Sequence, residues 1–209
     1  MKSCPVDEAS LVVAAKSGDL EAFNLLVVKY QDMLFRISLR IIRDELGAED
    51  ATQYALIQAY KSLHSFRGGS FRSWLVRIAV NASYDELRRE KRHISQALEQ
   101  FNAEGEEIES PTWMEDLSAG PHELAETSEV NRALQQCIRN LIPDYRLMVI
   151  LVDIEGLSYE EAARVTRVPV GTVKSRLARA RMQLRSSLRK FEEILPTAYQ
   201  VELPKFAHA

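Results

Sequence analysis

Residues 158–185, SYEEAARVTRVPVGTVKSRLARARMQLR, constrain the fold of this 209-residue chain more than any other segment. The pattern predicts two short helices joined by a tight turn. With about 3.6 residues per turn, the second helix has an apolar face made of Val173, Leu177, Ala180, Leu184 and Leu188. The opposite face is made of Ser175, Ala178, Arg179 and Met182, with Lys174 and Arg185 beside it. A short helix with an apolar back and a basic front fits the major groove of duplex DNA.

The basic residues of this helix divide into candidate base contacts and candidate phosphate contacts. Residues 164–190 hold nine Lys or Arg and no acid. Arg179, at the centre of the front, is the candidate for a bidentate contact with a guanine edge, and Ser175 and Lys174 could reach bases or phosphates. Cations further from the centre are expected to hold phosphates: Arg176, Arg181 and Arg185. The alternative is a solvated basic helix that binds nothing.

On its own, the negative net charge of the chain argues against DNA binding, but the distribution of the charges removes this objection. The whole chain carries −3, but residues 93–131 carry ten acids and no Lys or Arg. The rest of the chain is therefore basic, and two basic blocks flank an acidic segment.

The length allows two small helical domains, and the periodicity places them at either end of the acidic segment. In the first domain, residues 1–94, helical patterns cover residues 19–43, 47–63 and 70–92. Gly47 is expected to precede the second helix, whose inward residues would include Tyr60. Ser70 is expected to cap the third helix.

An acidic flexible linker is expected over residues 95–121, and a second domain over 122–190. Pro143 would open one helix of this domain, Gly156 would follow it, and Ser158 with Glu161 predicts a capping box. The fold class is therefore all-α, with a helix-turn-helix ending the second domain. Residues 191–209 form an apolar extension of unknown role, which could fold back on this domain or bind a regulator.

The helix over 70–92 carries a second candidate site. Arg77, Asn81, Tyr84 and Arg88 form one polar stripe. The amide of Asn81 can read a base edge, and aromatic side chains beside cations suit single-stranded nucleic acid. Trp74 could stack on a base or pack in the core, and residues 67–70 could wall a pocket for an extruded base. The alternative is an ordinary solvated face.

No pattern in the sequence indicates catalysis, a metal or a cofactor. Four histidines are scattered, at His64, His93, His122 and His208, and Cys4 and Cys137 lack metal-site spacing. No small-molecule substrate is expected. The longest apolar run, residues 148–152, is far too short to span a bilayer, so we expect a cytoplasmic protein without membrane insertion.

Three motifs resemble those of the extracytoplasmic-function (ECF) sigma factors of bacterial RNA polymerase, in the family's order and separation. They are GAEDATQYALIQAYKSLHSFRG (47–68), FRSWLVRIAVNASYDELRR (71–89) and EGLSYEEAARVTRVPVGTVKSRLARAR (155–181). The resemblance covers most of residues 10–190. It implies a region 2, which binds core polymerase and the melted −10 element, and a region 4, which reads the −35 element.

Carried onto this sequence, the resemblance implies three sets of site residues. Asp50 and Gln53 would bind core polymerase, while Tyr54 stands where a Glu is usual. The −10 element would be bound by Phe66, Arg67, Gly68, Ser70, Trp74, Arg77 and Asn81. The −35 element would be read by Lys174, Ser175, Arg176, Ala178 and Arg179, with Ala178 reduced to a thymine-methyl contact. Thr166–Arg167 replaces the commoner Leu-Gly, which predicts a slightly strained turn.

The expected function is therefore a promoter-specificity subunit that acts with core RNA polymerase on promoter DNA and is held by an anti-sigma factor. The acidic linker could mimic RNA in the polymerase exit path, or it could be a solubilising tether. One rival is a stand-alone helix-turn-helix regulator, which would bind an operator without polymerase. A second rival is an adaptor whose basic blocks bind acidic proteins.

Overall fold

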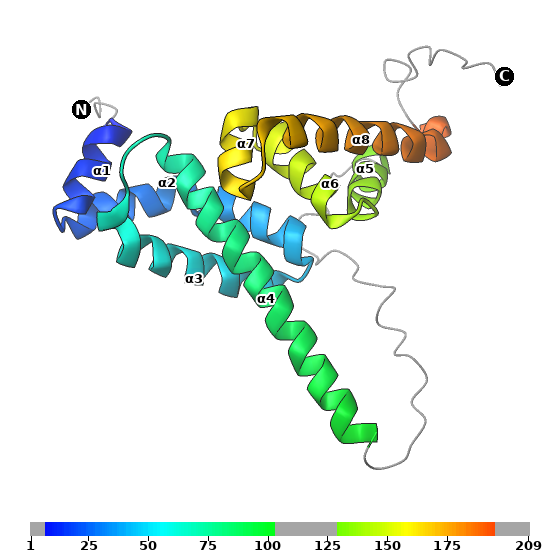
Figure 1. Ribbon diagram of the computed structural model, residues 1–209, viewed down its shortest axis with the longest axis horizontal. Coiled ribbons are helices and arrows are strands. Elements are labelled where there is room, and N and C mark those ends of the chain that lie inside the picture. Colours follow the sequence, from blue (N-terminus) through cyan, green and yellow to red (C-terminus); the bar gives the residue numbers. More distant parts are fainter. Residues whose placement is uncertain (1–6, 103–128, 195–209) are drawn as a thin grey trace.

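The protein is all-helical over the residues described by its computed structural model, 7–102 and 129–194 (Figure 1). No residue in these two ranges belongs to a strand. Four helices make the first domain: α1 (Glu8–Lys16), α2 (Leu20–Ile42), α3 (Glu45–Ser62) and α4 (Phe71–Asn102). The second domain comprises α5 (Glu129–Arg139), α6 (Pro143–Met148), the π-helical turn η3 (Val149–Ile154), α7 (Tyr159–Thr166), α8 (Val170–Leu188) and the turn η4 (Arg189–Ile194).

The core of the first domain is a three-helix packing of α2, α3 and α4, as the periodicity predicts. Leu34 and Ile37 of α2 are completely buried against the small residues of α3. Asp19 caps α2 by accepting hydrogen bonds from the amides of Glu21 and Ala22, at 2.9 and 3.1 Å. The buried residues of α3 are all small: Ala48, Ala51, Thr52, Ala55 and Ala59. The helices can therefore approach closely, and larger residues on this face would cause strain.

Two details of α3 differ from the sequence expectation. Gly47 lies inside the helix, which begins at Glu45 because the Asp44 carboxylate accepts a hydrogen bond from the Gly47 amide at 2.7 Å. Tyr60, expected inward, is 47% exposed and only tilts its ring against Phe23, with ring centroids 5.0 Å apart. Its neighbour Ala59, also expected inward, is completely buried.

A helix that the sequence analysis missed, α1, packs on α2. The Glu8 carboxylate accepts hydrogen bonds from the Lys29 ammonium and the Tyr30 hydroxyl. Burial, with the hydrogen bond to Glu8, raises the pKa of Tyr30 to about 12. This triad fixes α1 against the rest of the first domain.

The long helix α4 continues to Asn102, past the domain boundary predicted at residue 94 (Figure 1). Ser70 caps it as expected, because its hydroxyl accepts a hydrogen bond from the Ser73 amide at 3.2 Å. The first eight residues of the predicted linker are therefore helical, and the remainder of residues 95–121 lies outside the described ranges, as does the extension after residue 194.

The second domain begins its central helix at Pro143, as predicted, but this helix changes to a π-helical turn at Val149. The Glu155 amide donates to the carbonyl of Ile150, and the Leu157 amide to that of Leu151, both at 2.9 Å. The wider turn keeps Ile150 and Leu151 completely buried. It also turns Glu155 toward the first domain.

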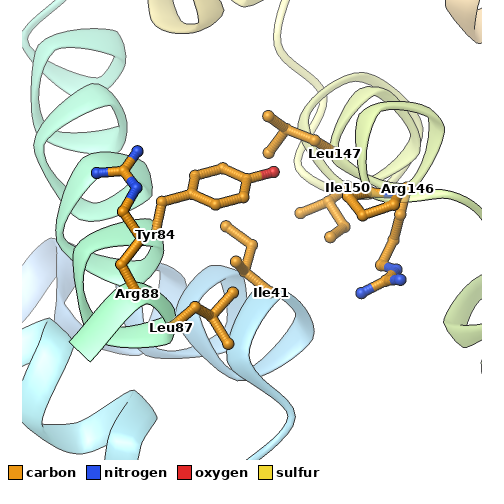
Figure 2. Close-up of a pocket in the computed structure, with 8 residues that line it drawn as sticks. Ile41, Tyr84, Leu87, Arg88, Arg146, Leu147 and Ile150 are labelled. Carbon is orange, nitrogen blue, oxygen red and sulfur yellow. The ribbon is translucent and has the colours of Figure 1, made fainter. Parts of the chain in front are cut away.

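The two domains contact each other directly. Helix α7 packs on α4, and η3 packs on α2. Between them lies a cavity of about 180 Å³ lined mainly by apolar groups. Figure 2 shows Tyr84 reaching from α4 toward Leu147 and Ile150, with Ile41 of α2 beneath it. The chain is therefore folded with its two domains closed on each other.

Candidate nucleic-acid interfaces

The outer face of α8 is the more complete of the two candidate sites. The inner residues Val173, Leu177, Ala180 and Leu184 are buried, as the sequence pattern predicts. The outer residues are exposed: Lys174, Ser175, Ala178, Arg179 and Met182. The Lys174 ammonium lies 5.7 Å from the Tyr159 ring centroid. An exposed helix face with small residues between cations can approach base edges closely.

Helix α7, which packs on α8, begins with a fully formed capping box. The Ser158 hydroxyl accepts a hydrogen bond from the Glu161 amide at 3.1 Å, and the Glu161 carboxylate accepts one from the Ser158 amide at 3.0 Å. Pro169 precedes α8, and the Val173 amide donates to its carbonyl. Side chains therefore cap the start of α7, whereas the start of α8 has backbone hydrogen bonds alone.

Two of the predicted phosphate contacts already have partners inside the second domain. The Arg176 guanidinium lies 2.7 Å from the Asp144 carboxylate. Arg181 makes two hydrogen bonds to Asp153, at 3.1 and 2.5 Å. The hydrogen bond to Asp153 raises the pKa of Arg181. These two arginines hold α8 on the domain, and three other candidate cations of this helix remain exposed: Lys174, Arg179 and Arg185.

The turn between α7 and α8 carries the strain that its sequence predicts. Arg167 ends α7 in the left-handed region, at φ 56° and ψ 38°, and its neighbour Val168 donates to the Ala163 carbonyl at 3.2 Å. A side chain in this conformation costs roughly 1–2 kcal/mol relative to glycine.

Arg167→Gly is therefore expected to stabilise the second domain by up to about 1 kcal/mol, since the freer unfolded glycine offsets part of the relief. Thermal denaturation followed by circular dichroism would measure the change. Arg164→Gly, the same substitution one turn earlier inside α7, should instead destabilise by about 1 kcal/mol. A loss of stability in both variants would contradict the strain at Arg167.

The second candidate site begins at the loop before α4. Arg67, Gly68 and Gly69 are exposed, and both glycines have positive φ, at 96° and 88°. The loop is held from outside, because the Lys16 ammonium of α1 donates to the Phe66 carbonyl at 2.7 Å. Phe66 itself is 8% exposed, so its ring packs in the core and does not form an accessible surface.

Trp74 shares an aromatic cluster with Phe66 and Phe71, with ring centroids 5.4 Å from each. Trp74 is partly exposed, so its ring packs in this cluster and also has a part that a base could contact. Ser70, Trp74, Arg77 and Asn81 recur at helical spacing on one side of α4, and Asn81 at its far end is exposed. This stripe is long enough, at about 1.5 Å per residue, to follow several nucleotides.

The predicted polar stripe does not continue as expected beyond Asn81. Tyr84 turns away from it and into the cavity between the domains (Figure 2), where burial raises the pKa of its hydroxyl. Arg88 lines the same cavity and pairs with Asp85. Tyr84 therefore belongs to the domain contact in this arrangement.

The predicted polymerase-binding residues lie on another helix. Asp50 and Gln53 are exposed on α3, with Asp50 3.9 Å from the Arg89 guanidinium. Next to them stand the apolar side chains of Tyr54 and Ile57, which are 54% and 51% exposed. Exposed apolar groups beside polar ones are typical of a protein-binding surface.

The sequence analysis missed the groups that join the domains, because each is unremarkable within its own helix. Arg72, Ser73 and Glu155 gain their role only from the packing of α4 against α7 and of α2 against η3.

Neither a metal-binding group nor a membrane-spanning helix is found in the described part of the chain. Residues 7–102 and 129–194 contain no cluster of three or more His, Cys, Asp or Glu suited to a metal ion. Within the same ranges, no helix has both the length and the apolarity to cross a bilayer.

Known families match both domains. The family described as Sigma-70 region 2 matches residues 26–93, and Sigma-70, region 4 matches residues 131–184. The RNA polymerase sigma-H factor of Pseudomonas aeruginosa is 37% identical over 183 residues, which is 87% of this chain and 93% of the relative. The ECF RNA polymerase sigma-E factor of Escherichia coli K12 is 39% identical over 173 residues, covering 82% of this chain and 88% of the relative.

Solved structures show the same fold. The sigma factor RpoE of Bartonella quintana, crystallised with the anti-sigma factor NepR, superposes with a TM-score of 0.64 at 26% identity, covering 81% of this chain and 98% of that one. CnrH, solved with the cytosolic domain of CnrY, gives a TM-score of 0.62 at 23% identity, over 88% of this chain and 97% of that one.

Proposed function

This chain belongs to the ECF sigma factors of the sigma-70 family, and from that premise we propose which of its surfaces carry out each step of promoter recognition. It is a promoter-specificity subunit of RNA polymerase. The first domain, α1–α4, acts as region 2, and the second, α5–α8, acts as region 4. The observation that carries the assignment is the pair of accessible helix faces, one on each domain: the exposed outer face of α8 and the partly exposed stripe of α4 that ends at the exposed Asn81.

Region 4 reads the −35 element as duplex DNA through the outer face of α8. Its base-reading residues are Lys174, Ser175, Ala178 and Arg179, while Arg176 acts from its ion pair with Asp144. Region 2 holds the melted −10 element along the stripe from Ser70 to Asn81, beside the loop of Arg67 and Gly68. Asp50 and Gln53 on α3 contribute to binding core polymerase.

The energetic task of region 2 is to offset strand separation. Opening DNA costs about 1.4 kcal/mol per base-pair step, and each captured base returns roughly 1–3 kcal/mol. Each captured base therefore offsets the opening of roughly one to two base pairs, and the polymerase core supplies the catalysis. The chain itself has no catalytic role, and it works in the cytoplasm.

The sigma factor of Bartonella quintana was crystallised with an anti-sigma factor. We infer that this chain has such a partner too. Release from that partner would then control when the polymerase receives this subunit.

The test is transcription by purified core polymerase on a library of random promoters, with and without this protein. A shared promoter pattern that appears only with the protein would support the proposal. Tight duplex binding by the protein alone, with no effect on polymerase, would instead indicate the stand-alone regulator.

Asn81→Ala is expected to impair strand opening more than closed-complex binding, because Asn81 would touch DNA only after melting. Permanganate footprinting of unpaired thymines measures opening, and gel mobility shift at low temperature measures the closed complex. Asn24→Ala, another exposed asparagine but on α2, should leave both unchanged. Equal losses of opening and closed binding with Asn81→Ala would contradict the assignment.

A further inference from the structure

The cavity of about 180 Å³ between the two domains lies outside the surfaces proposed for promoter recognition. Both domains contribute to its apolar wall. Tyr84 and Leu87 come from α4, Ile41 comes from α2, and Leu147 and Ile150 come from the second domain (Figure 2). The aliphatic side chains of Ile41, Leu147 and Ile150 are buried. A cavity with a wall of this kind suits an apolar ligand.

The charge at the cavity is positive. Arg88 and Arg146 are the charged side chains among the described residues that line it. Arg88 is paired with Asp85, whereas Arg146 makes no ion pair with any residue in the described ranges. Burial, together with the nearby charge of Arg43, lowers the pKa of Arg146 to about 10, so this side chain is still a cation at neutral pH. An unbalanced positive charge therefore lies beside the apolar wall.

Arg146 also has an unused hydrogen-bond donor. One terminal nitrogen donates to the Leu141 carbonyl at 2.9 Å. The Nε–H group of Arg146 is buried and meets no acceptor among the described residues. Since a buried donor without an acceptor is unfavourable, a ligand oxygen at this position would be stabilising. The Tyr84 ring reaches across the cavity toward the same domain and brings a hydroxyl group with it (Figure 2).

The volume of the cavity limits the size of the ligand. A cavity of about 150 Å³ with a wall of aliphatic and aromatic side chains is large enough to bind benzene. The volume here, about 180 Å³, leaves room for one such ring and one small polar group. A carboxylate is the matching group, because its two oxygens can accept hydrogen bonds from the fork of a guanidinium. Drug-sized ligands need pockets of about 300 Å³ or more.

We propose that this cavity is a binding site for a small aromatic carboxylate, whose ring lies against Tyr84 and Ile150 and whose carboxylate binds Arg146. Such a ligand touches both domains at once. It binds only while the domains are in contact, and by linkage it favours that contact. The site shares no residue with the surfaces proposed for promoter recognition, so neither depends on the other.

The experiment uses the full chain without polymerase, and sodium benzoate is the probe. Methyl NMR of protein labelled at the isoleucine δ1 methyl groups reports on Ile41 and Ile150, which lie in different domains. At constant ionic strength, benzoate should shift both signals along saturating curves with one dissociation constant. For a ligand of this size we expect a value on the order of 0.1–1 mM.

Two relatives of benzoate test the two parts of the site. Benzyl alcohol keeps the ring without the charge, and it should bind at least about tenfold more weakly, because it loses the charge-assisted hydrogen bonds to Arg146. Acetate keeps the carboxylate without the ring, and it should not saturate over the same concentration range. Equal affinities for benzyl alcohol and benzoate would overturn the role of Arg146. Equal affinities for acetate and benzoate would overturn the role of the apolar wall.

Arg146→Met removes the charge and the Nε–H group but keeps an unbranched side chain. It should weaken benzoate binding at least about tenfold and leave the affinity for benzyl alcohol unchanged. Arg164→Met is the matched control, because Arg164 is an exposed arginine of α7 that does not line this cavity. Benzoate affinity in this control should equal that of the wild type.

A second variant tests the site if Arg146→Met loses helical content. Leu87→Trp adds a large ring from a partly exposed position on α4, so it should fill the cavity and abolish benzoate binding. Leu46→Trp is its control, because Leu46 is 74% exposed on α3 and does not line the cavity. Thermal denaturation of both variants shows whether the fold is kept.

The absence of a saturating shift with benzoate would overturn the proposal. So would a shift of Ile41 without Ile150, because the ligand would then bind one domain alone. Unchanged benzoate affinity in Leu87→Trp would place the ligand outside the cavity, which also contradicts the proposal. None of these measurements depends on transcription, so a failure of the sigma-factor assignment would appear separately, in the polymerase assay.

Discussion

Leu177→Ala is expected to destabilise region 4 by about 2–5 kcal/mol, the largest effect of any single substitution considered in this domain. Leu177 is 1% exposed and lies at the centre of the inner face of α8, so truncation leaves a cavity among Val173, Ala180 and their neighbours. Domains of this size have only about 5–15 kcal/mol of net stability. A large fraction of what holds α8 in place would therefore be lost.

Native-state hydrogen exchange of the α8 amides measures this loss within region 4 itself. Met182→Ala is the matched control, since Met182 lies on the same helix and is 67% exposed. Its stability should stay within about 0.5 kcal/mol of the wild type. If Leu177→Ala exchanged no faster than this control, the inner face of α8 would not be the core of region 4.

Arg179→Ala is expected to cost about 1–3 kcal/mol of discrimination at one base pair of the −35 element, or about five- to 150-fold in relative affinity. Arg179 is exposed on the outer face of α8, and a bidentate contact to guanine requires its planar guanidinium. Selection of promoters from a library randomised over the −35 element, with the assembled holoenzyme, shows whether the preference is lost at one position only.

Two further variants separate base reading from charge. Arg179→Lys keeps the charge but not the fork geometry, so it should lose most of the same preference. Arg185→Ala, which removes an exposed cation further along α8, should weaken binding on all sequences and reduce the salt slope by about 1. A uniform loss with Arg179→Ala would make Arg179 a phosphate contact.

Patterns with a local physical cause were predictable from the sequence. The buried stripe of α8 follows from helical periodicity, and the capping box of Ser158 and Glu161 follows from the spacing of two residues. The left-handed Arg167 also agrees with the strain expected of its turn. In each case neighbours within one or two turns determine the outcome.

Features set by partners distant in sequence were not predictable. Arg181 was expected on phosphate, but Asp153, 28 residues away, binds it. The π-helical turn at Val149 has no composition signal, because it results from how Ile150 and Leu151 fit the core. Glu155 and Ser73 gain their roles from the other domain, and no pattern within one helix indicates that.

The hydrogen bond from Lys16 to the Phe66 carbonyl affects how region 2 can be exchanged between related sigma factors to make hybrid proteins. Helix α1, which supplies Lys16, lies wholly before residue 26, where the match to the family begins. A hybrid sigma factor joined at residue 26 would take the loop after Phe66 from one parent protein. It would take the residue at position 16, which donates the hydrogen bond to this loop, from the other. A segment exchanged to transfer −10 specificity should therefore begin before Glu8, so that it contains both the loop and Lys16.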